Sequence, residues 1–159
     1  MKFYKYHGAG NDFLIADGRG KTLNISPEYI SAVCDRHTGF GADGVMVLED
    51  SQDHDFRMRY YNSDGSGGMM CGNGGRCIVA FAADLGYKHF DFEAPDGLHV
   101  ATVQSAESFA PTARIVSLKM KDVAGAVRHE DGWFLDTGTR HFVKFVSDLA
   151  TCDVFHEGR

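Results

Sequence analysis

The chain has neither a long hydrophobic run nor an excess of positive charge. Its longest apolar stretch, Cys77 to Ala83, has seven residues, whereas a membrane-spanning helix needs about 20. Sixteen basic and twenty-two acidic side chains leave a net charge of −6, which argues against a nucleic-acid groove or an anionic membrane surface. We therefore expect neither nucleic acid nor membrane among its partners.

Cysteine is also scarce. Four cysteines in 159 residues are too few for a disulfide scaffold, so a reduced, cytoplasmic protein is expected. Met1-Lys2-Phe3 leads straight into polar sequence, which predicts no secretory signal. The chain has no internal repeat and no Pro/Ser-rich linker, and its length is typical of one domain. We expect residues 1–159 to form a single domain.

Glycine, in contrast, is abundant: 19 of the 159 residues are glycine, and 13 of these fall at or before position 75. Eleven of these 13 gather in three segments, at 7–13, 39–44 and 62–77. Glycine lets the backbone approach a ligand closely, and the first N–H groups of a helix are unpaired, so a glycine-rich helix start predicts an anion site. The sequence has no GK[ST] and no G-x-G-x-x-G on a βαβ unit. A carboxylate is therefore expected rather than a phosphate.

Short β-branched and aromatic runs predict seven strands. They lie at residues 13–16, 45–48, 56–61, 88–93, 99–103, 114–119 and 142–146. Two helices are predicted as well. The first has Ser26 as its N-cap and Pro27 in its first turn, and it is closed by Gly39. The second runs from about Cys71 to Leu85 and ends at Gly86.

The second predicted helix is apolar on every face over residues 77–83. Such a helix is buried rather than amphipathic. Strands precede and follow it in the sequence, so its natural place is inside a strongly curved sheet. The predicted fold class is α+β, with a curved, mostly antiparallel β-sheet or barrel wrapped around a central buried helix.

Cys71 stands where the second helix begins. Free amides and the positive end of the helix dipole stabilise a thiolate there, so Cys71 is a candidate base or nucleophile, although many cysteines are simply small buried residues. Cys77 lies about 240° round the helix and ~9 Å along it, too far to share one substrate atom with Cys71. We assign Cys77 to the core and Cys34 to helix packing, while Cys152 carries no functional indication. No cysteine spacing suits zinc, so no metal site is expected.

Three asparagines and one histidine complete the candidates. Asn11, Asn62 and Asn73 each stand within a glycine-rich turn, where asparagine is common for structural reasons alone. Three uncharged amides near one thiol also suit recognition of a zwitterion or carboxylate. His141 opens a predicted strand, and a lone histidine is more often structural than functional.

Several spaced motifs occur in order along the first half of the chain. They are KxHGxGNDF at 5–13, DRHxGFGADG at 35–44, FRMR at 56–59, NxDGS at 62–66 and MCGNGxRC at 70–77. A weaker motif, TGxxH, follows at 137–141. Together they resemble the diaminopimelate epimerase family. Proline racemases resemble this plan too but have a histidine where Asn73 stands, and phenazine-biosynthesis-type isomerases lack the cysteine at the position of Cys71.

The resemblance implies an enzyme that interconverts LL- and meso-2,6-diaminopimelate in lysine and peptidoglycan precursor synthesis, without pyridoxal phosphate, metal or nucleotide. No cofactor is therefore expected. It implies two similar domains, each a barrel-like sheet around a helix, with the substrate between them and one cysteine from each at its α-carbon. Residues 1–159 correspond to the N-terminal domain, and the second domain is expected to be absent from this chain. Homodimers are common in the family.

The resemblance also implies roles for individual residues. The catalytic residues are Cys71 and His141, and the substrate-binding residues are Asn11, Asn62, Gly72 and Asn73. Family members usually have Gly-Asn-Pro-His or Gly-Ser-Pro-His at 138–141, where this chain has Thr139 and Arg140. Two alternatives stay open: a related isomerase with another amino-acid substrate, and a non-catalytic module that binds a carboxylate. An isolated fragment is expected to be inactive.

Overall fold

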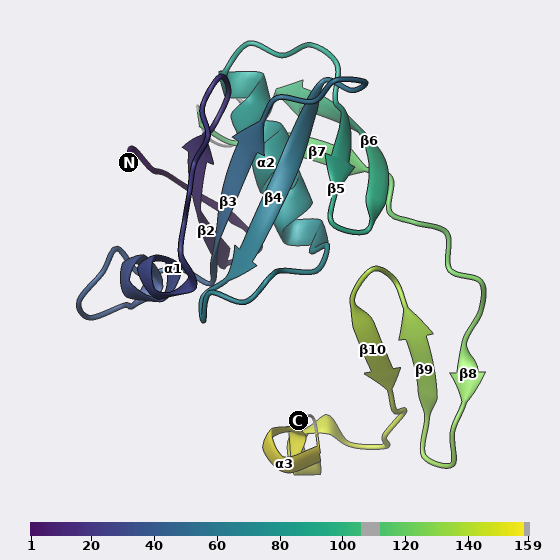
Figure 1. Cartoon of the computed structure of the whole chain (residues 1–159). Coiled ribbons are helices and arrows are strands. Elements are labelled where there is room, and N and C mark those ends of the chain that lie inside the picture. The colour runs from purple at the N-terminus through teal and green to yellow at the C-terminus, as the bar shows by residue number, and fades with distance from the viewer. Residues whose placement is uncertain (106–111, 158–159) are drawn as a thin grey trace. The chain divides into compact units, whose positions relative to one another are not determined.

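The computed structural model describes residues 1–105 and 112–157. The chain forms two compact units, Met1–Lys121 and Asp122–Arg159, called here the first and the second unit. Figure 1 labels the helices and strands of both, and each unit is described by itself. No helix in the described ranges is long and apolar enough to cross a membrane.

A seven-stranded mixed sheet forms the first unit (Figure 1). Its strands follow the order of the sequence: β1 (Tyr4–Gly8), β2 (Asn11–Asp17), β3 (Gly44–Glu49), β4 (Phe56–Asn62), β5 (Asp91–Ala94), β6 (Gly97–Ser105) and β7 (Arg114–Leu118). The pairs β2–β3 and β4–β5 are parallel, and the other four pairs are antiparallel. Parallel neighbours need crossover connections, and these contain α1 (Pro27–Cys34) and α2 (Gly72–Asp84).

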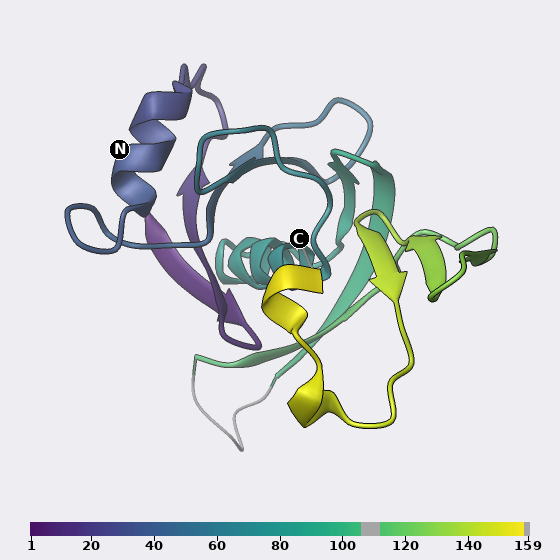
Figure 2. The ribbon, with the colours of Figure 1, turned by 90° about the horizontal axis from the view of Figure 1, so that it is seen from below.

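The sheet is curved, because α2 contacts strands at both of its edges, β1 and β7, as well as β2, β3 and β6. Figure 2 shows the strands of the first unit curving past this helix. The helix buries seven of its residues: Gly74, Gly75, Cys77, Ile78, Val79, Phe81 and Ala82. A curved half-barrel of mixed strands with few helices confirms the coarse form of the predicted α+β class.

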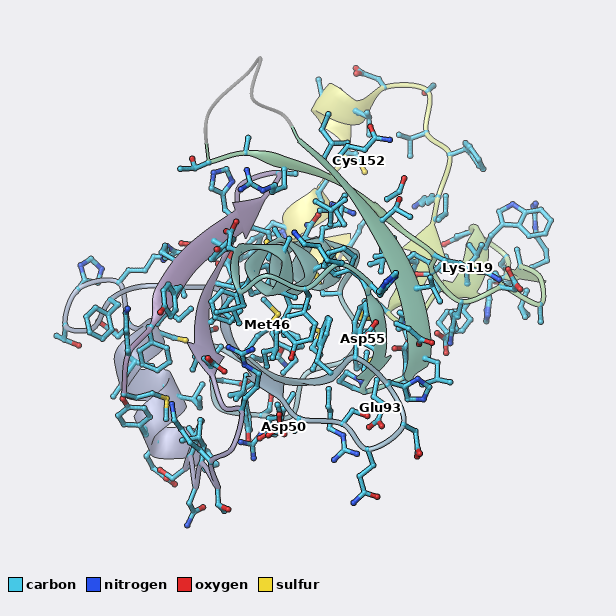
Figure 3. The ribbon with its side chains drawn as sticks, turned by 90° about the horizontal axis from the view of Figure 1, so that it is seen from above. Met46, Asp50, Asp55, Glu93, Lys119 and Cys152 are labelled. Carbon is cyan, nitrogen blue, oxygen red and sulfur yellow. The ribbon has the colours of Figure 1, made fainter. Side chains whose placement is uncertain are left out.

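Strands β2 and β3 are buried on both faces, since successive strand residues point to opposite sides. One apolar cluster, on the α2 side, includes Phe13, Ile15, Met46 and Leu48. A second, on the α1 side, includes Leu14, Val45, Val47, Ile30 and Val33. Met46 is labelled in Figure 3, and its sulfur would lie 3.3 Å from a Cβ added at Gly74. The first turn of α2, which follows Cys71, is thus packed against the sheet.

The first helix is shorter than predicted. Ser26 caps it as expected, with Oγ accepting from the Tyr29 N–H at 3.2 Å, but α1 ends at Cys34 rather than near Gly39. The Asp35 carboxylate accepts hydrogen bonds from the N–H groups of His37 and Thr38 at 2.8 and 2.6 Å, which turns the chain out of the helix. The prediction over residues 35–38 was therefore wrong.

Several strand boundaries also differ from prediction. The patterns do not predict β1, where Lys5 and His7 separate half-buried residues. The strand predicted at 88–93 begins only at Asp91. The strand predicted at 142–146 runs instead from Arg140 to Val143 as β10.

The second unit is a small antiparallel meander. Strands β8 (Val127–Arg128), β9 (Trp133–Asp136) and β10 (Arg140–Val143) are followed by a 3₁₀ turn η1 (Leu149–Thr151) and the short helix α3 (Val154–Glu157). No apolar side chain in the described part of this unit is buried. The hydrophobic core described here therefore belongs entirely to the first unit.

Candidate active site

The glycine-rich segments meet at one end of the first unit's sheet. β1 ends at Gly8, which pairs with Asn11 at the start of β2. β3 lies beside β2 and starts at Gly44, which pairs with Asn62 at the end of β4. Helix α2 starts at the same end, because a Cβ added at Gly8 would lie 3.2 Å from the carbonyl oxygen of Asn73. Residues from three separate motifs are thereby brought together.

Cys71 is the N-cap residue of α2, as predicted, with extended backbone angles and a side chain that makes no capping hydrogen bond. The first intrahelical bond runs from the Gly75 N–H to the Cys71 carbonyl at 2.8 Å. The N–H groups of Gly72, Asn73 and Gly74 precede it, and within the described ranges they have no backbone partner. A partly exposed thiol therefore stands beside three amides that can receive an anion.

Two of the three asparagines contact this helix start directly. The Cys71 thiol lies 3.5 Å from Asn11 Oδ1, and Asn73 Nδ2 donates to the same oxygen at 3.4 Å. Asn62 does not contact the helix start in this way. It lies at the end of β4, where its Nδ2 donates to Ser66 Oγ at 3.0 Å. The prediction that all three occupy turns was wrong: Asn11 begins β2, Asn62 ends β4 and Asn73 lies in the first turn of α2.

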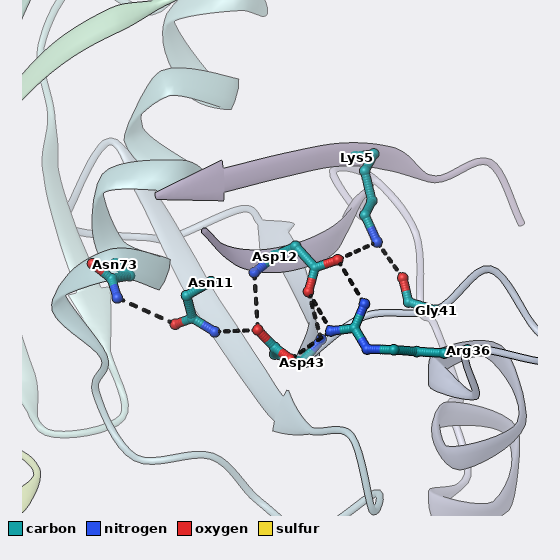
Figure 4. A network of polar contacts seen from close by, with 7 residues as sticks. All are labelled: Lys5, Asn11, Asp12, Arg36, Gly41, Asp43 and Asn73. Carbon is teal, nitrogen blue, oxygen red and sulfur yellow. Dashed lines mark hydrogen bonds and ion pairs between the residues drawn. The ribbon is translucent and has the colours of Figure 1, made fainter. Parts of the chain in front are cut away.

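A network of charges adjoins Asn11 and was not among the predicted candidates (Figure 4). Its members are Lys5, Asp12, Arg36 and Asp43. The hydrogen bonds from Arg36 hold the pKa of the Asp12 carboxyl well below its usual range, against the opposing effect of burial, and Lys5 lowers it further. These residues stand inside the glycine-rich motifs, but a charge in such a loop has the same sequence signature as a solvated surface residue.

The other cysteines of the chain have different surroundings. All four are free. Cys77 and Cys34 are buried in the two apolar clusters, which confirms that both thiols belong to the packed interior. This burial raises the pKa of Cys77 to about 12 and also raises that of Cys34. Cys152 is half-buried in the second unit.

The end of the sheet that carries Cys71 is distinct from a cavity on the side of the first unit. That cavity, of about 770 Å³, lies beside β1, α2 and β7 and is lined by Tyr6, Cys77, Asp84 and Arg114, among others. Cys71 and the three asparagines are not among its lining residues. Nearer the site, burial raises the pKa of Tyr60 to about 12, so its phenol stays neutral at neutral pH.

His141 lies in β10 of the second unit with an exposed side chain. Its Nδ1 is 2.8 Å from the Thr139 carbonyl oxygen and 3.3 Å from Thr137 Oγ1. A carbonyl can only accept, so neutral His141 carries its proton on Nδ1 and offers Nε2 as a proton acceptor.

Comparison with known proteins identifies the family. The family profile described as diaminopimelate epimerase matches residues 3–116. The chain belongs to this family. It is 46% identical to the diaminopimelate epimerase of Flavobacterium psychrophilum, covering 99% of this chain and 60% of that protein. It is 42% identical to that of Chlorobaculum tepidum, covering 95% and 60%, and 35% identical to that of Aquifex aeolicus, covering 100% and 62%.

This member of the diaminopimelate epimerase family thus spans about 60% of the length of these curated relatives. Its fold is similar to that of a Bacillus anthracis phenazine biosynthesis protein of the PhzF family. The TM-score is 0.51 at 20% identity, covering 79% of this chain and 44% of the other. At that identity the likeness concerns the fold alone, and it agrees with the curved mixed sheet.

Proposed function

We propose that the whole protein interconverts LL- and meso-2,6-diaminopimelate, as an isomerase of lysine and peptidoglycan precursor synthesis. The observation that carries the proposal is the Cys71 thiol at the start of α2, in a chain of the diaminopimelate epimerase family. The unpaired amides of Gly72 and Asn73 hold the α-carboxylate of the substrate, which places its α-carbon next to the thiol.

The reaction moves one proton through the α-carbon. A thiolate on one face takes the α-proton, and the electron pair of the C–H bond stays on the carbon as a carbanion conjugated with the carboxylate. A thiol on the opposite face gives its proton to that carbon, so the two sulfurs exchange protonation states and the configuration inverts. Cys71 is one of the two sulfurs, and the part of the protein outside this chain supplies the other.

The helix start contributes stabilisation as well as binding. The α-proton of an amino acid is very weakly acidic, so negative charge that develops toward the carboxylate must be stabilised. Amides fixed at the N-terminus of α2 are oriented before the reaction starts, and such preorganised donors are worth several kcal/mol in a site that excludes water. Asn11 and Asn62 contact polar groups of the substrate, and His141 assists proton transfer.

The remaining features of the proposal concern the whole protein. Residues 1–159 form its N-terminal domain, in which the sheet encloses α2; the contacts of this helix with β1 and β7 support that arrangement. The protein works in the cytoplasm, in keeping with four free cysteines, and forms homodimers as the family resemblance suggests. Its chemistry uses the two thiols without a cofactor.

The test uses the complete protein, LL-diaminopimelate and D₂O, and follows both deuterium at the α-carbon and the appearance of the meso isomer. Cys71→Ala should lower turnover by about 10²–10⁴-fold, the range of a lost acid–base group, while Cys152→Ala should leave it unchanged. Near-normal turnover by a folded Cys71→Ala protein would remove Cys71 from the mechanism.

The same assay tests the substrate contact of Asn62. Asn62→Ala should raise KM by about tenfold with a smaller change in kcat, because a contact made before and during the reaction mainly affects binding. Asn24, an exposed asparagine of the same first unit, provides the matched control. Equal effects of Asn24→Ala and Asn62→Ala on KM would contradict the assignment.

A further inference from the structure

The side-chain amide of Asn11 lies between two partners of opposite kind. Its Nδ2 donates to Asp43 Oδ2 at 2.6 Å, whereas its Oδ1 faces Asn73 Nδ2 at 3.4 Å and the Cys71 sulfur at 3.5 Å. The amide of Asn73 continues the series, since its Oδ1 accepts from the guanidinium of Arg76. A chain of hydrogen bonds therefore runs from the Arg76 cation through two amides to the Asp43 anion.

The charged ends of this chain determine how both amides are oriented. A guanidinium can only donate, and a carboxylate can only accept. Asn73 must therefore turn its oxygen toward Arg76, and Asn11 must turn its NH₂ group toward Asp43. The amide oxygen of Asn11 is left facing Cys71. Figure 4 shows the amide part of the chain, in which Asn11 lies between Asn73 and Asp43.

Asp43 is itself held firmly in place. Its Oδ1 accepts from Arg36 at 2.7 Å, and Oδ2 also accepts from the backbone N–H of Asp12 at 3.1 Å. In return, the Asp43 N–H donates to the backbone carbonyl of Asp12 at 2.9 Å. The carboxylate therefore presents one fixed oxygen to Asn11.

We propose that Asp43 is a positioning residue that, through Asn11, keeps an oxygen acceptor facing Cys71 and so favours the protonated thiol over the thiolate. An amide oxygen accepts a hydrogen bond from S–H but has nothing to donate to S⁻. The free amides of α2 act in the opposite direction, because they favour the thiolate. The inference rests on the proposed function, in which Cys71 must serve as both acid and base, and a balance between the two forms suits that double role.

Several charged or titratable groups interact with the Cys71 thiol or with the amides of Asn11 and Asn73 beside it. They are Arg76 on α2, Tyr60 on β4, Asp43 before β3, and, through Asp43, the charges of Arg36, Asp12 and Lys5. Loss of the Asp43 charge would by itself favour the thiolate through space. The test must therefore separate that field effect from the orientation of the Asn11 amide.

The experiment measures alkylation of Cys71 by iodoacetamide, with peptide mapping, near pH 7 and at about pH 10, where a thiol with an ordinary pKa of about 8.5 is ionised. The alkylation rate near pH 7 divided by the rate at about pH 10 reports the thiolate fraction near pH 7. Changes in the accessibility of the thiol affect both rates and cancel in this ratio. Asp43→Asn and Asn11→Ala should each raise this ratio by several-fold and at most about tenfold, the effect of losing one hydrogen bond. In the double variant, Asp43→Asn should raise the ratio by clearly less than it does alone, because only its field effect then remains.

Two further variants complete the design. Asp43→Glu keeps an acceptor-only group and should retain the original ratio. Asp17→Asn is the matched control, because Asp17 pairs with Arg19 at 2.8 Å at the far end of β2, and it should also leave the ratio unchanged. If the Asp43→Asn protein is not folded, Asn11→Ala still tests the proposal. Because the proposed effect acts through Asn11, an unchanged ratio in folded Asn11→Ala would contradict it.

An unchanged ratio in folded Asp43→Asn would overturn the proposal. So would an equal increase with and without Asn11, which would show a field effect only. The assay needs no substrate, so its outcome is independent of epimerase turnover. A complete protein that lacks epimerase activity would refute the proposed function and leave the thiol result standing, and the reverse outcome is equally distinguishable.

Discussion

A thiol reacts through its thiolate, and burial in an apolar core disfavours that form, so the four cysteines of this chain differ in expected reactivity. Burial raises the pKa of Cys34 and Cys77, whereas Cys71 is partly exposed beside the amides of α2. We expect Cys71 to be alkylated fastest of the four near neutral pH. A short iodoacetamide pulse on the folded chain, followed by peptide mapping, measures the order.

Cys152 is the informative comparison in that experiment, since it is also half-buried. It follows η1 and precedes the short helix α3. At the start of α3 the N–H of His156 donates to the Asp153 carboxylate at 3.1 Å, so that amide has a partner. Faster labelling of Cys152 or Cys34 than of Cys71 would contradict the role assigned to the start of α2.

At this scale the sequence identifies some of the site and misses the rest. Cys71 could be placed because a glycine-rich run before an apolar helix determines which residue caps it. The interior position of Cys77 followed from helix geometry, and that of Cys34 from the lack of a zinc-like spacing around it. The role of Asp43 could not be inferred, because its contact with Asn11 joins residues 32 positions apart and nothing in local sequence distinguishes it from a solvated acid.

At the scale of the elements, the segment between β4 and α2 packs closely against the Tyr60 ring. A Cβ added at Gly68 would lie 1.9 Å from Tyr60 Cδ1 and within 2.4 Å of Cε1. We expect Gly68→Ala to lower the free energy of unfolding by about 1–3 kcal/mol, the usual cost of overpacking. Urea denaturation of the chain measures the change.

The neighbouring glycine supplies the control for that substitution. A Cβ at Gly67 would meet nothing within 4 Å, so Gly67→Ala should leave stability unchanged or raise it by less than about 1 kcal/mol. Similar losses in both variants would mean that chain flexibility, rather than the Tyr60 contact, requires glycine here.

The charges around Asp12 join β1, β2 and the loop after α1, and they predict a pH dependence. Because Arg36 and Lys5 lower its pKa in the folded chain, Asp12 stabilises the fold fully above its unfolded pKa of about 3.9, and that contribution is lost as pH falls toward the folded value. Asp12→Asn should therefore lose about 1 kcal/mol less stability than the original chain between about pH 7 and pH 3, because only the unfolded-state carboxylate is protonated in that range.

Unfolding by urea at the two pH values tests this, with the exposed Asp53→Asn as control. Asp53→Asn should follow the pH dependence of the original chain. A pH dependence of Asp12→Asn equal to that of the original chain would show that its ion pairs contribute nothing to acid stability.

The elements best predicted are those whose ends are marked by local capping residues. Ser26 and Pro27 determine the start of α1, and Gly86 with its positive φ of 98° follows the end of α2. The end of α1 was missed because Asp35 bonds the next N–H groups, which a reading of apolar periodicity does not detect. β1 was missed because its apolar contacts are made far along the sequence, where Tyr4 and Tyr6 pack on Phe81.

Over the whole molecule, the two units differ in how they bury apolar surface. The first has two apolar clusters, whereas in the described part of the second Phe142, Phe145, Leu149 and Phe155 are 54–85% exposed. The prediction of one domain over residues 1–159 relied on length and on the absence of a linker, and it stays a prediction. Since the family's curated members are longer than this chain, we expect additional protein to cover these side chains.

Residues 1–159 alone should have no measurable diaminopimelate epimerase activity. Inversion needs a proton donor on the face opposite Cys71, and Cys77 and Cys34 are buried with raised pKa values. Cys152 has no glycine-rich helix start beside it. A single half-site also leaves the substrate exposed to water, where stabilisation of a carbanion by fixed amides is much weaker than in a closed pocket.

The assay for this prediction is α-proton exchange of LL-diaminopimelate in D₂O with analysis of product stereochemistry. Cys71 alone can return a proton only to the face from which it was taken, so any slow deuterium uptake by the fragment should occur with retention of configuration. Formation of the meso isomer at a rate comparable to that of a complete relative would overturn the two-thiol mechanism. It would require a second acid within these 159 residues, and Cys34→Ser, Cys77→Ser and Cys152→Ser variants would then identify whether a thiol provides it.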